Sequence, residues 1–408
     1  MIRVLHAAIS CEPGGRREAI RTLALRQQRL GVRPDVCCLE RLGCDAEWFR
    51  NVFDRHVLLE RRGLFDRAAF ERLKRFCDER EIDIIHAHDA ASQALAALLR
   101  LNRPQIKLLM TFHRTLRIDS AAWSDRVRNL LAALPCGAVV VGSRERRDHF
   151  LHENFVPESK VVRIPFGVDI DRFRADAALR AEARRVIGVD DETCVFGAVG
   201  HFGEEKGIDI VLRGYAELVR WLPPAARTKL IVLGEGSADR HKIIESLAAA
   251  IPSDRLMLAG FRQNVEFWFN AMDVFVHAPR QEAFGLVVAE AMATRLPVVA
   301  AAVGGIVDLV VDGESGLLVG HEDALGLAEA MHKLRCYRWM RDRMAARSES
   351  VARTALTADL YARRYLDLYH DLLADRQPRG VDEADAGLPE PIPINAGTAH
   401  RQGVAPCP

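Results

Sequence analysis

The chain has 408 residues, too many for one ordinary hydrophobic core, and this length predicts two domains. Hydrophobic residues make up 49% and charged residues 28%, which is typical of a globular protein. The formal net charge of +1 argues against a nucleic-acid partner. The nine cysteines form neither a disulfide framework nor the paired spacing of a zinc site, which indicates reduced thiols in a cytoplasmic protein.

Neither a secretion signal nor a membrane span is expected. The first six residues have a short strand pattern rather than that of a signal peptide. The most apolar stretch, residues 284–311, is interrupted by charged residues, Pro and Gly, so it falls short of the ~20 apolar residues of a span. We therefore expect a cytoplasmic protein that can touch the inner face of a membrane without crossing it.

Short apolar runs alternate with helical spacings along the chain, in two successive series. The first series has predicted strands at 3–8, 35–39, 82–87, 107–111, 138–141 and 161–164, and helices at 17–30, 68–77 and 90–101. The second has strands at 194–199, 230–233, 255–258, 274–277, 297–301 and 316–319, and helices at 208–220 and 286–293. This alternation predicts an α/β protein with two doubly wound parallel sheets, whose ligand site lies in the cleft between the domains.

The domain boundary is predicted in the region 165–189. We assign residues 1–175 to an N-terminal domain and 190–352 to a C-terminal domain. Residues 353–375 have an amphipathic pattern and are predicted to form a helix that crosses back to the N-terminal domain. Residues 376–408 are rich in Pro, Gly and Asp and are predicted to be a disordered tail.

Two glutamates flank the start of an apolar predicted helix. Glu282 precedes Phe284 and Gly285, the helix begins at Leu286, and Glu290 lies one to two turns inside it. The free N–H groups and the positive dipole end of such a helix suit an anion. A buried carboxylate at Glu290 needs partners, which the adjacent hydroxyls of a ribose would supply. The pattern therefore predicts a ribose at Glu290, a diphosphate at the helix start and a sugar at Glu282.

Residues 273–319 resemble the retaining glycosyltransferases of family 4, whose signature is a Glu-x7-Glu motif. The segment reads Asp273-Val-Phe-Val-His-Ala-Pro-Arg-Gln-Glu282-Ala-Phe-Gly-Leu-Val-Val-Ala-Glu290. The resemblance extends to Gly304-Gly305, to 230–236 and, in the first half, to Gly14-Gly15, His88-Asp89, 111–113 and 167–169. It implies the GT-B fold, a nucleotide-diphosphate sugar as donor, and a hydroxyl of a saccharide or lipid-linked acceptor.

The same resemblance assigns further residues. Lys206 matches the lysine with which the family grips the donor diphosphate, whereas His201 stands where the family usually has Arg. The loop with Gly14 and Gly15 is expected to close on the donor phosphates and the acceptor, because glycine lets the backbone approach a ligand closely. His113 is expected near the transferred sugar. Glu282, Lys206 and His113 are the expected catalytic residues.

A metal cofactor is not expected. Asp169 and Asp171 look like the D-x-D metal motif of another glycosyltransferase architecture, but the GT-B class normally needs no metal, and helix N–H groups with Lys206 can neutralise a diphosphate. Arginines at 114, 117, 126, 128, 144, 146 and 147 are interpreted either as a solvated face or as a docking surface for an anionic membrane or a lipid-diphosphate acceptor.

Two alternative functions stay open at this point. A non-catalytic nucleotide-sugar-binding protein is suggested by His201 and by Phe166, which stands where the family usually has Asn. A sugar-nucleotide epimerase of the same fold is the second, although the Glu-x7-Glu pattern argues against it. Donor hydrolysis or transfer by the purified protein separates the first alternative from a glycosyltransferase.

His201 predicts a pH-dependent donor affinity. Imidazole is only partly charged near neutral pH and lacks the guanidinium fork, so donor binding should weaken as His201 loses its proton. In His201→Arg the affinity should be higher and should no longer change across the range in which histidine titrates, as measured by calorimetry with a nucleotide-diphosphate sugar. Unchanged affinity and an unchanged pH profile would contradict this.

Overall fold

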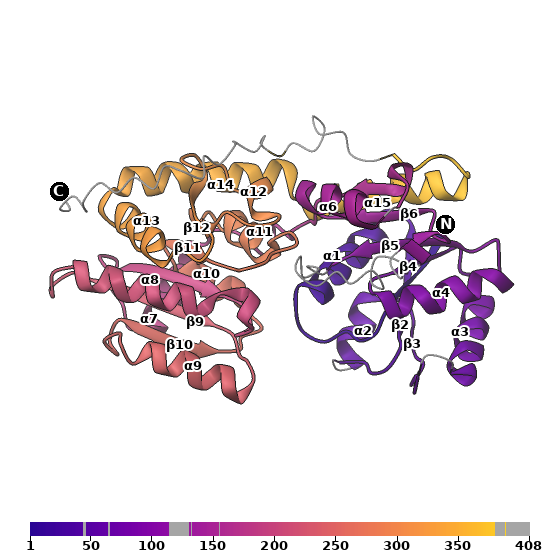
Figure 1. Ribbon diagram of the computed structural model, residues 1–408, viewed down its shortest axis with the longest axis horizontal. Helices are drawn as coiled ribbons and strands as arrows, with labels where there is room; N and C mark the ends of the chain where they lie inside the picture. The colour runs from indigo at the N-terminus through magenta and orange to yellow at the C-terminus, as the bar shows by residue number, and fades with distance from the viewer. Residues whose placement is uncertain are drawn as a thin grey trace. The chain divides into compact units, whose positions relative to one another are not determined.

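The computed structural model describes residues 1–43, 46–63, 66–113, 130–131, 133–154, 156–379 and 388. They form two α/β units (Figure 1). The first contains the described residues of Met1–Gly167 and Leu356–Ala386, and the second is built on Val168–Ala355. The predicted disordered tail, residues 376–408, lies outside the described residues except for 376–379 and 388.

The first unit contains a parallel sheet with the strand order β3-β2-β1-β4-β5-β6-β7. Its strands are β1 (Ile2–Ala8), β2 (Val32–Cys38), β3 (His56–Leu58), β4 (Ile84–Ala87), β5 (Lys107–Phe112), β6 (Ala138–Val141) and β7 (Val161–Arg163). Its helices include α1 (Gly15–Arg29), α2 (Ala46–Val52), α3 (Arg67–Arg80), α4 (Ala90–Asn102), α6 (Arg144–Asn154), the short η2 (Glu158–Lys160) and α15 (Ala358–Leu373). Strand β6 is apolar throughout and fully buried because both faces of the sheet are covered.

The second unit contains a parallel sheet with the order β10-β9-β8-β11-β12-β13. Its strands are β8 (Cys194–Val199), β9 (Thr228–Leu233), β10 (Leu256–Gly260), β11 (Val274–His277), β12 (Val298–Ala301) and β13 (Gly316–Val319). Its helices include α7 (Ala177–Val186), η3 (Glu204–Lys206), α8 (Ile208–Trp221), α9 (Ala238–Ala248), α10 (Val265–Ala271), α11 (Leu286–Ala293), α12 (Ile306–Leu309), α13 (Ala324–Cys336) and α14 (Arg338–Ala355). The prediction of two doubly wound parallel sheets is confirmed.

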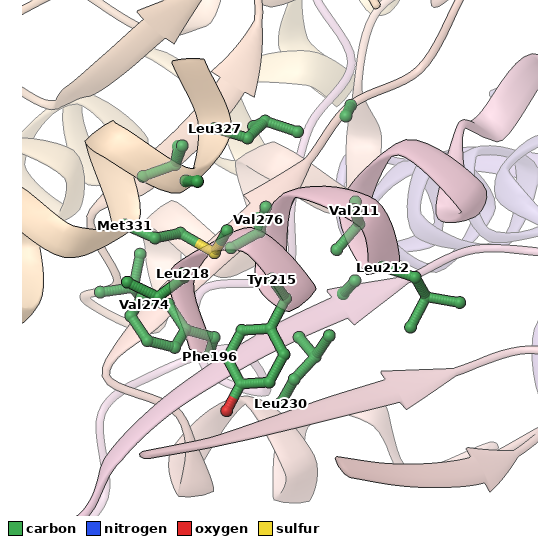
Figure 2. Close-up of a cluster of buried hydrophobic side chains, with 14 of the residues drawn as sticks. Phe196, Val211, Leu212, Tyr215, Leu218, Leu230, Val274, Val276, Leu327 and Met331 are labelled. Atoms are coloured by element: carbon green, nitrogen blue, oxygen red, sulfur yellow. The ribbon is translucent and has the colours of Figure 1, made fainter. Parts of the chain in front are cut away.

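The core of the second unit lies between its sheet and helices α8 and α13 (Figure 2). Helix α8 begins at Ile208 and turns one apolar face inward, so that Tyr215 and Leu218 are fully buried. Leu327 and Met331 of α13, one helical turn apart, reach the same cluster. This packing covers one face of the sheet.

The last helix, α15, returns to the first unit and packs against α1, as Figure 1 shows. Thr357 caps its start by accepting a hydrogen bond from the N–H of Leu360. Tyr361, Tyr365 and Tyr369, spaced four residues apart, form one buried stripe. The predicted crossing of the C-terminal helix to the N-terminal domain is confirmed.

The differences from the predicted elements are mostly omissions. Every predicted strand overlaps an observed one, but β3 at the sheet edge was not predicted because three residues are too few for a periodic pattern. Several helices were not predicted, among them α14, whose apolar stripe is diluted by five arginines in RWMRDRMAARSESVARTA. No helix in the described part of the chain is both long enough and apolar enough to span a bilayer.

Two leucines on helix α13 provide a matched test of this core. Leu327 is fully buried, whereas Leu325 is 57% exposed. Leu327→Ala should lower the free energy of unfolding of the second unit by about 2–5 kcal/mol, because it opens a cavity. Leu325→Ala should change it by less than about 0.5 kcal/mol. Urea denaturation followed by circular dichroism measures both, and equal effects would contradict the packing described.

Candidate active site

The loops that follow β8 and β11 meet at the carboxyl edge of the second sheet. The turn after β8 ends at Gly207, which has a φ of 62° and begins α8. A Cβ atom at this position would lie 1.8 Å from the carbonyl oxygen of Ala278, in the loop after β11. Glycine is therefore required twice over, for its backbone conformation and for the close approach. This approach brings Lys206 beside Glu282.

Glu282 is the centre of a small charged cluster. Its Oε2 accepts a hydrogen bond from the Lys206 ammonium at 2.8 Å and lies 3.2 Å from Nε2 of His277, the last residue of β11. Glu282 is 9% exposed and His277 is buried, whereas Lys206 is half-buried. The carboxylate is therefore held in place by a cation on one side and an imidazole on the other.

The cluster favours the ionised form of Glu282. Burial acts to raise the pKa of this carboxyl, but the charge of Lys206 and the bond with His277 outweigh it, and the pKa lies well below its usual range. Burial lowers the pKa of His277, partly offset by its bond to Glu282. The site thus holds a carboxylate that can accept hydrogen bonds from hydroxyl groups at any pH near neutrality.

A second ion pair stiffens the same two loops. The Arg280 guanidinium donates to both carboxylate oxygens of Asp209 on α8, at 2.9 and 2.8 Å. It also donates to the carbonyl of Glu204, and its backbone N–H donates to the carbonyl of Glu205. A bidentate pair of this kind fixes orientation as well as distance. Arg280 therefore ties the Lys206 turn to the loop that carries Glu282.

Helix α11 begins next to Glu282 with free backbone donors. Gly285 precedes it with a φ of 94°, and no side chain caps the first turn. Phe284 is buried, while Leu286 is half-buried and leaves the helix start accessible. Uncapped N–H groups and the positive end of the helix dipole make this position suitable for a phosphate. The observed start at Leu286 is the predicted one.

Glu290 differs from its prediction in one respect. It was expected to be a buried carboxylate, but in the structure its side chain is half-buried, inside the short helix α11. Leu286, Val287 and Glu290 lie on the one face of this helix that is not fully buried. The desolvation argument for a ribose at Glu290 is therefore weaker than the sequence indicated, although the residue stays accessible to a ligand.

His201 occupies an exposed turn and has local partners. Its Nδ1 accepts the N–H of Gly203 at 3.0 Å, and its Nε2 lies 3.0 Å from a carboxylate oxygen of Glu205. The bond to Gly203 leaves the ring proton on Nε2, where it is donated to Glu205. A ligand phosphate would have to compete with Glu205 for this donor.

The predicted glycine loop lies in the first unit, after β1. Gly14 and Gly15 are exposed, and a Cβ on either would meet no other atom within 4 Å. Helix α1 starts here without a side-chain cap. Behind the loop, Asp89 accepts the N–H of Ile9 and caps helix α4. The two glycines are therefore exposed to solvent, while the Asp89 hydrogen bonds fix the backbone that precedes them. This arrangement suits close approach by a ligand.

His113 follows β5 in the same unit. Its ring stacks on Phe166, with centroids 5.2 Å apart and an interplanar angle of 4°. Phe166 in turn packs edge-on against Tyr361 of α15. Nε2 of His113 lies 2.9 Å from Nδ1 of His88. The phenyl ring at position 166 thus covers one face of the imidazole that the sequence singled out.

Other predicted features have local roles or fall outside the description. Asp169 accepts the N–H of Asp171 in a tight turn. Of the arginines interpreted as a basic surface, those at 114, 117, 126 and 128 lie outside the described residues. Arg146 is buried, which contradicts a solvated position, and Arg147 pairs with Glu158.

Sequence reasoning missed His277, Arg280 and Asp209. His277 and Arg280 lie just before the glutamate motif, in the segment 273–290 that carries the family resemblance, yet neither was given a role. A signal for His277 was present, because a polar residue that ends an otherwise apolar strand lies at the carboxyl edge of a parallel sheet. No local signal pairs Arg280 with Asp209, which is 71 residues earlier in the chain.

The Glu282 cluster should make stability depend on pH. The folded-state pKa lies below the value of 4.5 for an unfolded glutamate, so the stabilisation is complete above pH 4.5 and is lost as the pH falls through the lower folded-state value. Between about pH 6 and pH 3 the melting temperature should therefore drop more for the wild type than for Glu282→Gln. Glu329→Gln, at an exposed position, is the control; three parallel curves would contradict the cluster's role.

Two family models match successive parts of the chain. Residues 13–172 match "Glycosyltransferase Family 4" and residues 193–335 match "Glycosyl transferases group 1". A D-inositol 3-phosphate glycosyltransferase of Kineococcus radiotolerans is 31% identical over 336 residues, covering 74% of this chain and 75% of that protein. D-inositol 3-phosphate glycosyltransferase 2 of Catenulispora acidiphila is 36% identical over 51% of this chain, and the match spans 52% of that relative's length.

The fold has close neighbours among solved structures. The Anabaena protein Alr3699/HepE, solved in complex with UDP-glucose, superposes with a TM-score of 0.79 and 19% sequence identity. The superposition covers 92% of this chain and all of that one. Together with the two parallel sheets, these similarities confirm the GT-B fold. The chain belongs to glycosyltransferase family 4, a family of GT-B enzymes.

Proposed function

We propose that this protein transfers a sugar, with retention of configuration, from a nucleotide-diphosphate donor to a hydroxyl of a saccharide or lipid-linked acceptor. The supporting observation is the grouping of Lys206, Glu282 and the uncapped start of α11 at one sheet edge. The complex of the similar Anabaena protein with UDP-glucose supports this class of donor. Synthesis of a polysaccharide or glycoconjugate in the cytoplasm or at the membrane's inner face is the proposed setting.

The donor would be held by complementary groups. The first turn of α11 and the Lys206 ammonium carry the positive charge that a diphosphate needs. Glu282, ionised and anchored, would accept hydrogen bonds from sugar hydroxyls, and the half-buried Glu290 would accept those of the ribose. His201 and the Gly14-Gly15 loop would complete the phosphate contacts. Because these groups supply both charge and orientation, the proposal involves no metal.

Lys206 has a double role in this proposal. An ammonium has three N–H donors, and one is used by Glu282 at 2.8 Å. The other two N–H groups can donate to a phosphate oxygen while the first stays bonded to the carboxylate. The same residue therefore keeps Glu282 ionised and neutralises the leaving group, which explains why the two lie in contact.

The proposed chemistry is a front-face displacement. The acceptor oxygen forms a bond to the anomeric carbon, the bond from that carbon to the diphosphate oxygen breaks, and the acceptor proton passes to the leaving diphosphate. Negative charge grows on the diphosphate in the transition state, where Lys206 and the α11 N–H groups stabilise it. His113 would bond a hydroxyl of the reacting sugars.

Transfer activity tests the proposal directly. Purified protein with a panel of nucleotide-diphosphate sugars should show a donor-dependent rise in melting temperature, because only the folded state binds the donor. With that donor and hydroxyl acceptors, the anomeric configuration of the product, read by NMR, should match that of the donor. Binding without hydrolysis or transfer would favour a non-catalytic nucleotide-sugar-binding protein.

Two substitutions sharpen the test. Lys206→Met should reduce kcat/KM by roughly 100- to 1,000-fold, because a transition-state charge loses its preorganised donor. Lys242→Met, on the exposed side of α9, is the matched control and should leave kcat/KM unchanged. A Lys206→Met enzyme with wild-type kcat/KM would remove this site from the mechanism.

A further inference from the structure

Four histidine rings lie in contact at the carboxyl edge of the first sheet. His6 is on β1, His86 is on β4, His88 follows β4 and His113 follows β5, and these three strands are neighbours in the order β1-β4-β5. The ring centroids of His6 and His88 are 5.3 Å apart, and those of His88 and His113 are 5.1 Å apart. The first three rings are buried, and His113 is half-buried.

Hydrogen bonds join three of these rings into a line that begins at Gln27 of α1. Nε2 of His6 lies 2.9 Å from Oε1 of Gln27, and Nδ1 of His6 lies 3.0 Å from Nε2 of His88. Nδ1 of His88 then lies 2.9 Å from Nε2 of His113. Each link uses Nδ1 of one ring and Nε2 of the next, so the line has one direction.

The direction follows from the end at Gln27. An amide oxygen only accepts, so His6 carries its proton on Nε2 and its Nδ1 is an acceptor. His88 must then donate from Nε2 and accept at Nδ1, and His113 must donate from Nε2. Nδ1 of His113 is left as an acceptor, and no partner for it is found among the described residues.

The amide of Gln27 is itself oriented by helix α15. Its Nε2 donates to the hydroxyl of Tyr369 at 2.8 Å. Having accepted that bond, the Tyr369 hydroxyl can give its proton to Nδ1 of His86, 3.0 Å away, and Nε2 of His86 then donates to Thr111 at 2.6 Å. Every member of this buried branch is satisfied when Gln27 has the orientation seen in the structure.

Two other uses of the cluster fit the contacts less well. Nitrogen atoms of His6, His86 and His88 lie within 4.8 Å of one another, close enough for a metal ion. Each ring nitrogen of these three residues nevertheless already has a hydrogen-bond partner. Burial lowers the pKa of all four histidines, which keeps the rings neutral and makes the line a poor acceptor for a proton.

We propose that Gln27, His6 and His88 are positioning residues that hold His113 as its Nε2–H tautomer and present its Nδ1 as a hydrogen-bond acceptor. The stacked Phe166 ring fixes the plane in which that acceptor points. The ligand class is a neutral hydroxyl group, because a bare imidazole nitrogen accepts from an O–H and gains nothing from a phosphate oxygen. The part that concerns a sugar hydroxyl rests on the proposed function; the tautomer assignment does not.

NMR of the full chain labelled with 15N in its histidine rings tests the tautomer without any ligand. Two-bond correlations should show His113 as Nε2–H in the wild type, with its signal assigned by loss in His113→Asn. Gln27→Met removes the accepting oxygen, so His113 should become a mixture of tautomers. The neighbouring Gln28→Met, whose amide donates to the carbonyl of Val52, should leave His113 unchanged.

A second variant guards against misfolding. His6→Phe keeps a ring of similar shape but breaks the line, and it should give the same mixture in a protein whose circular-dichroism spectrum matches that of the wild type. Its melting temperature should fall, because Gln27 and His88 each lose a buried hydrogen-bond partner. A wild-type His113 in the Nδ1–H form, or an unchanged tautomer in both Gln27→Met and His6→Phe, would overturn the assignment.

Activity separates this inference from the proposed function. With a functioning donor and acceptor, kcat/KM should fall about tenfold in Gln27→Met, corresponding to ~1.4 kcal/mol, and stay constant in Gln28→Met. A changed tautomer with unchanged kcat/KM would overturn the positioning role. If the tautomer changes as expected in Gln27→Met but the wild-type protein transfers no sugar, the proposed function is refuted while the tautomer assignment stays in place.

Discussion

The contact between Lys206 and Glu282 is the interaction on which the second unit's site depends. A carboxylate that is 9% exposed is costly unless cations and hydrogen bonds compensate for the lost water. Here an ammonium at 2.8 Å and an imidazole at 3.2 Å do so. To bring them together, the turn after β8 must touch the loop after β11, and this contact tolerates only glycine at position 207. The bidentate Arg280–Asp209 pair keeps the two loops in that arrangement.

In the first unit, the polar side chains buried around the four histidines are neutral and are stabilised by hydrogen bonds to one another. Its polar residues are buried at the ends of central strands, where an unpaired donor or acceptor would be expensive. Hydrogen bonds link Gln27, His6, His88 and His113 one after another. Tyr369 of α15 supplies a partner for Gln27 and for His86. Because helix α15 supplies Tyr365 and Tyr369, these polar side chains of the first unit gain their partners only when α15 has packed on the sheet.

Charge is therefore distributed unevenly between the groups proposed to act on the donor and acceptor. Glu282 stays ionised near neutral pH beside the Lys206 ammonium, and the contacts of this pair suit hydroxyls and phosphates. The four clustered histidines of the first unit stay neutral because burial lowers the pKa of each, and they suit hydroxyls alone. Phe166, which stands where the family usually has Asn, adds an apolar surface beside His113 rather than another polar contact.

Local patterns in the sequence determined much of this protein. Apolar runs located the strands, the length and alternation indicated two parallel sheets, and the glutamate motif marked Glu282 and the start of α11. These succeeded because strand and helix periods act over a few residues. Only the tertiary structure decided that His277 joins Lys206 at Glu282, that Glu290 is half-buried, and that Tyr369 orients Gln27 from 342 residues away. Such pairings depend on the order of the strands and on where the last helix packs. The periodicity of a short sequence segment contains no information about either.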